Sequence, residues 1–231
     1  MKYSWKVDDF DSKVFGFRVA KITDLDSKNV KKLIQDLVKN KIDYATCRVQ
    51  STNFSLIHAL GQFDFILIDG IISLSIDVSN LKFDVAMEIR EASKSDTSQL
   101  KKMTANLYSG TRITNDPKTR AFANNYYLRW VENSVNNIAA DSVLVWDEDG
   151  EILGYITLQK KGQIPLIGVS GKAREKGIAR SLLNAAFAKF KKWGVKTVNI
   201  DTQMGNIPAL RVYQGVGFKI VDSYLTFRWV A

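Results

Sequence analysis

The sequence contains one cysteine, Cys47, and one histidine, His58, among its 231 residues. A single cysteine excludes a disulfide within the chain, and we expect Cys47, in the stretch YATCRV, to be a buried strand residue. One histidine leaves almost no material for a zinc site or a Ser-His-Asp triad, so we predict no metal. Most hydrolase mechanisms are excluded on the same ground.

Long apolar runs are also missing. None approaches the roughly 18 to 20 residues that a membrane helix needs, and the amino-terminal segment MKYSWKVDDFDSKVFG is too acidic and too interrupted for a secretory signal peptide. Hydrophobic residues make up 45% of the chain and charged residues 25%, which is ordinary for a globular domain. We therefore expect a cytoplasmic protein without a membrane partner.

The positive charge is concentrated in the later part of the chain. Residues 1–84 carry 12 Lys and Arg against 11 Asp and Glu, whereas residues 85–231 carry 21 against 13. A positive field suits nucleic acid, a membrane surface or a polyphosphate cofactor, and a solvated basic face is the alternative. Because the basic residues gather at one turn and on one helix face, rather than among exposed aromatics, we expect no nucleic acid partner.

The periodicity of apolar residues predicts two α/β domains, residues 1–84 and residues 85–231. In the first, SKNVKKLIQDLVKN has helical spacing, and DYATCRV and FILIDGIISLSIDV are typical of strands. In the second, DSVLVWDEDGEILGYITLQ predicts a hairpin that turns at Asp149 and Gly150. Strands and helices then alternate up to a final strand, FKIVDSYLTFRWV.

The stretch VSGKAREKGIARSLLNAAF changes from a basic turn to a helix with one apolar face. The first N–H groups of a helix have no intrahelical partner and lie at the positive end of its dipole, so they bind anions readily. Gly177 allows a phosphate to approach this backbone, and Arg174 and Lys176 add charge. The turn is a candidate pyrophosphate site, although strand, turn and helix with one glycine is a common arrangement.

The motifs of the second domain resemble the GNAT acetyltransferase superfamily. The turn matches that family's (Q/R)xxGx(G/A) loop at Arg174, Gly177 and Ala179, and NIPALRVYQGVGF matches its NxxAxxxYxxxGF pattern. The resemblance covers residues 86–231. It implies an α/β acyl-CoA N-acyltransferase fold with a mixed central sheet, acetyl-CoA as cosubstrate, and direct transfer to a primary amine.

Four further segments resemble the GNAT group that acetylates nucleotide-linked 4-amino-4,6-dideoxy sugars: FDSKVFGFRVAKI, TRITNDP, YYLRWVENS and DTQMGN. Members of that group carry an additional amino-terminal α/β domain. The resemblance implies a nucleotide sugar as the amine acceptor, while a protein amine, an antibiotic or another small metabolite stays an alternative. A homodimer is also open.

The family resemblance assigns the coenzyme site to the strand, the turn and the helix that follows. Pantetheine would bind strand backbone beyond Pro165, which has no N–H to donate, and the turn would wrap the pyrophosphate. The implied coenzyme contacts are Ile167, Gly168, Val169, Arg174, Glu175, Lys176, Gly177, Ile178, Ala179, Arg180 and Asn206. Asn206 is also well placed to cap the helix of NIPAL, and both roles are compatible.

Acetyl transfer to a neutral amine requires no nucleophilic side chain, only correct placement and a proton for the departing thiolate. The resemblance implies that Tyr213 is the general acid, and a structural aromatic on a short amphipathic helix is the alternative. A phenol has a pKa near 10, so direct proton donation requires a tuned or well hydrogen-bonded environment.

Arg112, Asn115 and Asp116 match the loop that lies near the acceptor in the resembled family, so we assign them as substrate contacts. Arg112 suits a diphosphate, and a solvated loop cation is its alternative. Asp116 precedes Pro117 and is typical of a turn. No general base is evident: Asp116 and Glu88 are candidates only because they are carboxylates, and a chain of waters is the alternative.

Overall fold

The computed structural model describes residues 3–231, whose strands form two sheets. Met1 and Lys2, the first residues of the amino-terminal segment discussed above, lie outside the described residues. The larger sheet has seven strands in the order β1-β2-β3-β11-β4-β10-β8, and the smaller has four in the order β5-β6-β7-β9. The predicted mixed α/β fold is confirmed, and the hydrogen-bonded strand pairs include both parallel and antiparallel ones.

The strands of the larger sheet are β1 (Tyr3–Val7), β2 (Val19–Leu25), β3 (Tyr44–Gln50), β4 (Ile66–Asp77), β8 (Gln163–Ile164), β10 (Thr197–Gln203) and β11 (Lys219–Val230). Those of the smaller sheet are β5 (Ile89–Glu91), β6 (Ser142–Glu148), β7 (Glu151–Leu158) and β9 (Ile167–Val169). The α-helices are α1 (Asp9–Phe15), α2 (Val30–Lys39), α3 (Phe54–Gln62), α4 (Thr97–Thr104), α5 (Arg112–Asn115), α6 (Ala123–Val135), α7 (Ile178–Lys192) and α8 (Ile207–Gly215). Short 3-10 helices are η1 (Ser27–Asn29), η2 (Lys94–Asp96), η3 (Arg120–Phe122) and η4 (Gly171–Ala173).

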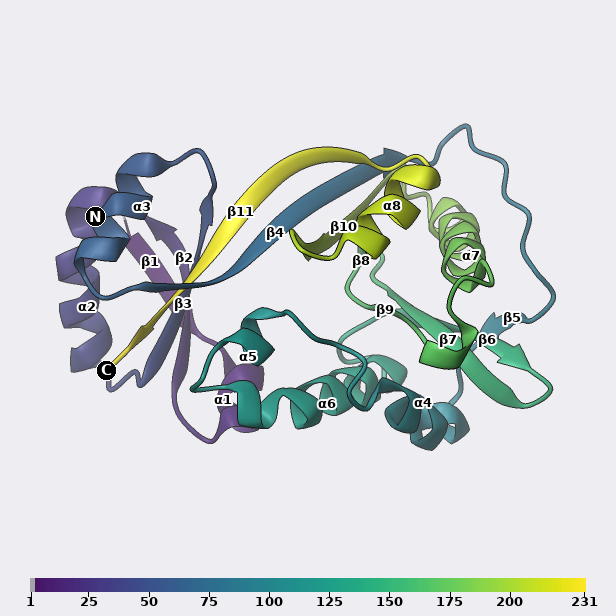
Figure 1. Cartoon of the computed structure of the whole chain (residues 1–231), viewed down its shortest axis with the longest axis horizontal. Coiled ribbons are helices and arrows are strands. Elements are labelled where there is room, and N and C mark those ends of the chain that lie inside the picture. The colour runs from purple at the N-terminus through teal and green to yellow at the C-terminus, as the bar shows by residue number, and fades with distance from the viewer. Residues whose placement is uncertain (1–2) are drawn as a thin grey trace.

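Two long antiparallel strands, β4 and β11, join the two halves of the molecule (Figure 1). The final strand, β11, also pairs with β3, and its Phe227 and Trp229 are buried in the core beneath α2 and α3. Strands from both sides of residue 84 thus share one sheet. The division into domains 1–84 and 85–231 stays a prediction, while hydrogen bonding and core packing run across it.

Local sequence rules explain several elements. The hairpin β6-β7 turns at Asp149 and Gly150, which both have positive φ, 51° and 84°. Two such residues make the tight turn that matches strand twist, which confirms the predicted hairpin. Cys47 is buried in β3, also as predicted, and burial raises the pKa of its thiol to about 12. The thiol is therefore inert at neutral pH.

The two sheets separate near Pro165. Gln163 and Ile164 of β8 pair in parallel with β10, but from Ile167 onward the chain pairs antiparallel with β7 instead. Proline has no N–H to continue the ladder on β10, which favours the departure at this point. The strand therefore moves away from β10 and leaves an opening beside its own free edge.

Candidate active site

The basic turn before α7 presents backbone donors to solvent. The first hydrogen bond within this helix runs from Ser181 N to Gly177 O, 3.1 Å, so the N–H groups of Ile178, Ala179 and Arg180 stay available to a ligand. Gly177 has φ +81°, and a Cβ placed there would meet nothing within 4 Å. The positive φ favours glycine, and the open space admits a bulky anion.

The remaining turn residues lie on the surface. Arg174, Glu175 and Lys176 are exposed, and Arg180 is exposed on the first turn of α7. Glu175 has φ +65°, in the left-handed region that is uncommon outside glycine. The structure therefore brings the predicted pyrophosphate contacts together at the start of α7. There the backbone N–H groups and the side chains of Arg174, Lys176 and Arg180 are exposed to solvent.

The register of β9 shows which of its backbone groups face the opening. Ser170 N donates to Leu153 O at 2.8 Å, and Thr157 N donates to Leu166 O at 2.9 Å. Antiparallel pairs alternate, so the intervening Gly168 faces Tyr155 across the ladder, whereas the N–H groups of Ile167 and Val169 point away from β7. These two are the backbone donors at the free edge.

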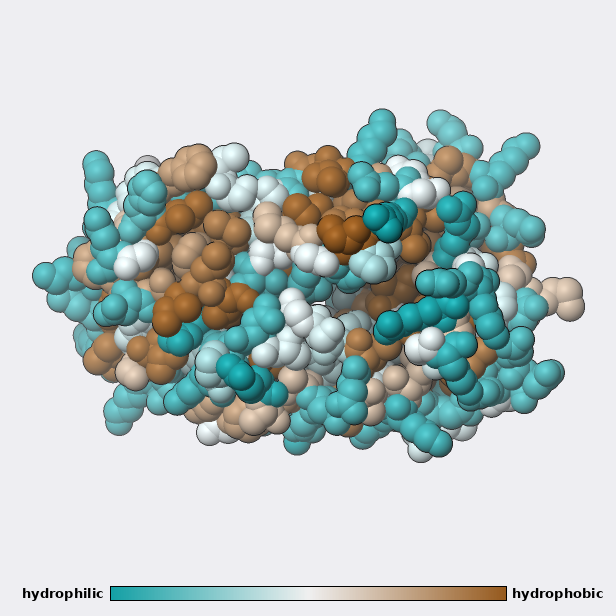
Figure 2. Space-filling view, viewed as in Figure 1, coloured by the Kyte–Doolittle hydropathy of each residue, from teal (hydrophilic) through white to brown (hydrophobic). Residues whose placement is uncertain are grey.

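A cleft of about 540 Å³ lies at this opening and is lined by residues from both halves of the molecule. The side that holds the predicted coenzyme contacts Ile167 and Asn206, called the coenzyme side below, also contains Leu166, Thr202 and Tyr213. The other side contains Asp8, Phe10, Asp11, Lys21, Arg48, Asp69, Arg112, Tyr126, Tyr127, Trp130 and Asp201. Figure 2 shows the surface hollowed near the middle of this face, between the two halves.

Tyr213 extends from α8 to the wall of this cleft and is only 5% exposed. Its ring packs edge-on against Phe218, with centroids 5.9 Å apart. Burial raises its pKa well above the ordinary value for a phenol, so the group is neutral at physiological pH. The protonated phenol can donate a hydrogen bond into the cleft, but the raised pKa makes it a weaker acid than an ordinary tyrosine, so the role of general acid stays a prediction.

Asn206 caps α8, which is the structural role considered from the sequence. Its side chain accepts from Ala209 N at 3.4 Å and donates to Thr202 Oγ1 at 3.1 Å. The residue also lines the cleft. Capping fixes the start of α8 and hence the placement of Tyr213, two turns further along the helix.

One face of the larger sheet forms the floor of the other side of the cleft, called the acceptor side below because the predicted acceptor contact Arg112 lines it. Lys21 of β2 lies opposite Thr46, and Arg48 stands two residues further along β3, on the same face. Arg48 pairs with Thr226, which in turn pairs with Asp69 of β4. Charged side chains from neighbouring strands therefore project toward α1, α5 and α6, which lie on that side of the strands in Figure 1.

Arg112 is held by an ion pair at the edge of this floor. Its Nη2 lies 2.8 Å from Asp11 Oδ2 and 2.9 Å from the Tyr126 hydroxyl, to which it donates. Its backbone N–H donates to Asp69 Oδ2 at 3.0 Å. Burial raises the pKa of Asp69, although the Arg112 N–H and Gln203 act in the opposite direction. Arg112 is therefore a fixed wall residue, not a solvated loop cation.

Lys21 and Arg48 carry the remaining positive charge of the floor. Arg48 reaches Asp201 on β10 at 3.1 Å. Partial burial lowers the pKa of Lys21, and the nearby charges of Arg48 and Arg112 lower it further. Within residues 3–231, Lys21 forms no salt bridge. The local field at this lysine is therefore positive and suits an anionic ligand.

The loop residues assigned to the acceptor separate in space. Arg112 lines the cleft, but Asn115 is exposed and its amide donates to Ile68 O at 3.1 Å. Asp116 has no exposed surface: it accepts from the Tyr44 hydroxyl at 2.7 Å and lies 3.3 Å from Arg228 Nε. The structure does not bring Asp116 to the cleft, because these buried partners hold its carboxylate inside.

The carboxylate of Glu88 is exposed beside β5 and does not line the cleft either. Sequence reasoning missed charged residues that do line the cleft, among them Asp11, Asp69, Lys21 and Arg48. All four come from residues before 84, on elements whose local patterns indicate only helix or strand. The sequence offers a signal for two of them: Lys21 and Arg48 are each a charged residue between two buried apolar neighbours on a strand.

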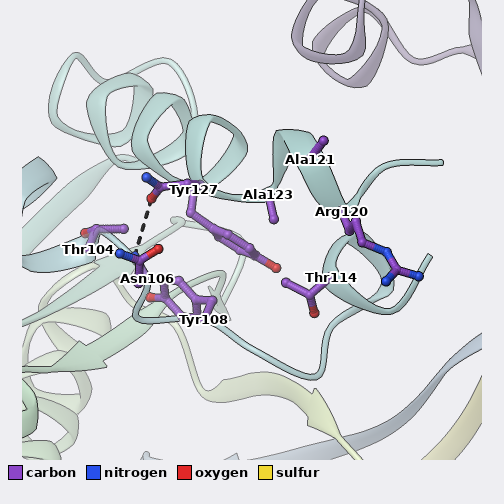
Figure 3. Close-up of a pocket in the computed structure, with 9 residues that line it drawn as sticks. Thr104, Asn106, Tyr108, Thr114, Arg120, Ala121, Ala123 and Tyr127 are labelled. Atoms are coloured by element: carbon purple, nitrogen blue, oxygen red, sulfur yellow. Dashed lines mark hydrogen bonds between the residues drawn. The ribbon is translucent and has the colours of Figure 1, made fainter. Parts of the chain in front are cut away.

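A second cavity, of about 240 Å³, lies beside the cleft and is drawn in Figure 3. Tyr108 and Tyr127 line both spaces. Their rings stack with centroids 4.5 Å apart. The other lining residues are Thr104, Asn106, Thr114, Arg120, Ala121, Ala123 and Asn124, and the dashed bond in the figure runs from Asn106 N to Asn124 Oδ1, 3.4 Å.

Comparison with known proteins agrees with this geometry. Residues 107–218 match the model of the Acetyltransferase (GNAT) family. The chain is also 32% identical over 118 residues to an N-alpha-acetyltransferase of Sulfurisphaera tokodaii, an alignment that covers 44% of this chain and 70% of that protein. The chain therefore belongs to the GNAT acetyltransferase family and is an acetyl-CoA-dependent N-acetyltransferase, which confirms the predicted family and enzyme class.

A second relative covers more of the chain. The sequence is 26% identical over 181 residues to dTDP-fucosamine acetyltransferase of Escherichia coli O6:H1, and the alignment covers 76% of this chain and 77% of that protein. A solved GCN5-related N-acetyltransferase from Sphaerobacter thermophilus has a TM-score of 0.67 at 15% identity, covering 99% of this chain and 76% of that chain. This structural likeness confirms the predicted fold.

Among the helices within residues 3–231, none combines the length and the apolar character that crossing a membrane requires.

Proposed function

We propose that this N-acetyltransferase moves the acetyl group of acetyl-CoA to the amino group of a nucleotide-linked amino-dideoxy sugar. The observation that carries the proposal is the single cleft in which the free edge of β9, Tyr213 and a floor of cations meet. The 26% identity to dTDP-fucosamine acetyltransferase supports a sugar nucleotide as the acceptor.

Acetyl-CoA would lie along the opening between β9 and β10. The N–H groups at the start of α7 would bind its pyrophosphate, with Arg174, Lys176 and Arg180 close by. The Val169 N–H would bind the pantetheine arm. The Ile167 N–H would polarise the thioester carbonyl and stabilise the negative charge that develops on its oxygen during attack.

Transfer would proceed by direct attack of the neutral amine on this carbonyl. The carbon–nitrogen bond forms, the carbon–sulfur bond breaks, and Tyr213 supplies the proton that the leaving thiolate takes. The amine gives up a proton to Asp69, whose raised pKa makes it a better proton acceptor than an ordinary carboxylate. Asp69 is only 7% exposed and lines the cleft, so it is placed for this task.

The acceptor's diphosphate would lie on Lys21 and Arg48. Lys21 forms no salt bridge within residues 3–231, and its pKa is lowered first by burial and then by the charges of Arg48 and Arg112, both of which a bound anion would offset. Arg112 Nη1 is buried and has no hydrogen-bond partner among the described residues. A buried donor of this kind is costly unless an acceptor atom reaches it, which supports a ligand oxygen at that wall.

The test is turnover with acetyl-CoA and a panel of dTDP-4-amino-4,6-dideoxyhexoses, followed by release of free thiol. The free amino sugars, without the nucleotide, serve as matched controls for the diphosphate contacts. We expect turnover on at least one nucleotide sugar and a much higher KM for the corresponding free sugar. No turnover across the sugar panel would contradict the proposal that the acceptor is a nucleotide sugar. It would not contradict the assignment as an acetyl-CoA-dependent N-acetyltransferase.

The same assay distinguishes the alternatives. Peptides with free amino termini, polyamines and aminoglycosides are added as separate acceptors, and turnover on one of these alone would replace the sugar. Filter binding of DNA at increasing salt concentration tests the alternative that the basic surface binds nucleic acid. DNA binding by a protein that fails to bind acetyl-CoA would reverse the proposal altogether.

A further inference from the structure

Tyr108 lies at the boundary between the cleft and the second cavity. It belongs to the loop between α4 and α5, and its ring stacks on Tyr127 at 4.5 Å between centroids. Figure 3 shows Tyr108 and Tyr127 side by side, with the Tyr127 ring extending toward Thr114. The two rings thus form a wall between two spaces of about 540 and 240 Å³.

The hydroxyl of Tyr108 lies beside the proposed carbonyl-binding point. It donates to Ile167 O at 3.3 Å. The C=O and N–H of one strand residue point to the same side, so the Ile167 carbonyl and its N–H both face away from β7. The Tyr108 hydroxyl therefore borders the position that the acetyl group would take if its oxygen accepts from Ile167 N.

This loop packs tightly on β9. A Cβ at Gly168 would come within 2.5 Å of Leu107 Cδ2 and 3.3 Å of the Tyr108 hydroxyl. A side chain at this position would therefore force the Leu107 side chain to move and would crowd Tyr155 and Tyr108, so the close approach of the loop favours glycine. The approach leaves little room between Tyr108 and the strand.

The ring of Tyr108 is also fixed in place. Its hydroxyl is 2.8 Å from the hydroxyl of Tyr155, which is fully buried and accepts from Thr104 Oγ1 at 3.3 Å. A buried network of this kind, together with the stack on Tyr127, opposes movement of the ring. A longer acyl chain therefore cannot displace it without breaking these contacts.

We propose that Tyr108 is the specificity-determining residue that limits the transferred acyl group to acetyl, because its ring fills the space into which a longer chain would extend. The second cavity lies behind that ring and would take the added carbons once the ring is removed. This inference rests on the proposed placement of acetyl-CoA along β9.

The experiment measures binding of acetyl-CoA, propionyl-CoA, butyryl-CoA and free CoA by isothermal titration, so it does not depend on the identity of the acceptor. We expect the intact protein to bind butyryl-CoA at least tenfold more weakly than acetyl-CoA. In Tyr108→Ala this ratio should fall at least fivefold. Tyr108→Phe, which keeps the ring and loses the hydroxyl, should retain a ratio within twofold of the original.

A ratio taken within one variant is insensitive to a general loss of folded protein, and Tyr108→Leu provides a milder truncation if the alanine variant does not fold. An unchanged ratio in the truncated variants, or equal affinity of the intact protein for acetyl-CoA and butyryl-CoA, would overturn this inference alone. Failure of the intact protein to bind acetyl-CoA would instead overturn the proposed function.

Discussion

The two sides of the cleft are built differently. The proposed coenzyme side offers backbone N–H groups of β9 and of the first turn of α7, which follow one another within residues 167–180. The acceptor side uses side chains from β2, β3, β4, α1 and α5, which are far apart in the sequence and meet across the sheet. A site made from local backbone is contiguous in the sequence, whereas a site made from side chains on a sheet face is not.

The two sides of the cleft also differ in how their charged groups are paired. The turn before α7 is open to solvent, so its charges attract a phosphate mainly through unpaired donors and a helix dipole. On the acceptor side two of the cations are already paired, Arg112 with Asp11 at 2.8 Å and Arg48 with Asp201 at 3.1 Å, while Lys21 forms no salt bridge within the described residues. The acceptor side is thus rigid before a ligand binds, and substitutions there should affect specificity and proton transfer more than coenzyme affinity.

The largest expected effect is at the junction of the two sides. Tyr213→Phe should lower kcat by about 100-fold or more, because general acid catalysis contributes that much and Tyr213 is the phenol that α8 contributes to the cleft. The dissociation constant for acetyl-CoA should stay within about threefold, since the ring remains. Steady-state kinetics and titration with acetyl-CoA provide both values. Tyr224→Phe, at a half-buried position of β11 that does not line the cleft, is the control, and an equal loss there would contradict a special role for Tyr213.

Asp69→Asn should lower kcat by about 100-fold at neutral pH, the scale of general base catalysis. Activity of the unchanged protein should fall as the pH drops through the pKa of Asp69, which burial raises above 3.8. The variant should lose this acidic limb, and a pH–rate profile measures it. An acidic limb that persists in the variant would assign the proton to another group.

The pH dependence of protein stability is a second test of the raised pKa of Asp69. A carboxyl whose pKa is raised on folding stabilises the native state below its unfolded pKa, and that contribution is lost as the pH rises through the folded pKa. Asp69→Asn should therefore be at least as stable as the unchanged protein at pH 7. Asp77, on the same strand, is the control, because hydrogen bonds from Ser79 lower its pKa and Asp77→Asn should give no gain at pH 7. Thermal unfolding at pH 4 and 7 compares the two variants.

Gly177→Val should raise the dissociation constant for acetyl-CoA about 10- to 100-fold, because a side chain at the helix start blocks charge-assisted hydrogen bonds to the pyrophosphate. The positive φ adds backbone strain of about 1–2 kcal/mol. Gly16→Val is the matched control, since Gly16 also has a positive φ, 74°, with open space around it, but lies beyond α1. Similar destabilisation with retained coenzyme affinity is expected there. Unchanged affinity in Gly177→Val would contradict the coenzyme site.

The smallest expected effect is on the floor of the acceptor side. Lys21→Met should raise the KM for the nucleotide sugar about 3- to 10-fold and leave that for acetyl-CoA unchanged, because one charge-assisted contact is lost. Rising ionic strength should raise the acceptor KM less in the variant than in the unchanged protein. Lys39→Met, at the end of α2, controls for net charge. An effect on acetyl-CoA instead would place Lys21 on the coenzyme side.

Sequence patterns predict the coenzyme side well. The helix of residues 178–192, the hairpin at Asp149 and Gly150, and the strand before the basic turn all follow from periodicity and turn chemistry. Helix caps, glycine conformation and free N–H groups depend on neighbours a few residues away. For that reason the location of the candidate pyrophosphate site, and of Tyr213 after it, could be proposed before the fold was known.

The acceptor side could not be predicted in the same way. From local signals Asp116 is a turn carboxylate near Arg112, but Tyr44 of β3 and Arg228 of β11 enclose it, and both are distant in the sequence. Asp69 and Lys21 read as ordinary polar residues of strands. Only the neighbouring strands decide whether such a residue faces water, a core or a cleft.

The sequence by itself therefore indicated the family, through its spaced motifs, and the helix and strand content and the backbone groups proposed for the coenzyme, which depend on short-range geometry. The tertiary structure decided that β11 returns to pair with β3 and β4, which places the early charged residues opposite Tyr213 in one cleft. It also decided that Tyr108 closes the cleft against a second cavity. These facts depend on strand order and packing between distant segments, which local patterns do not encode.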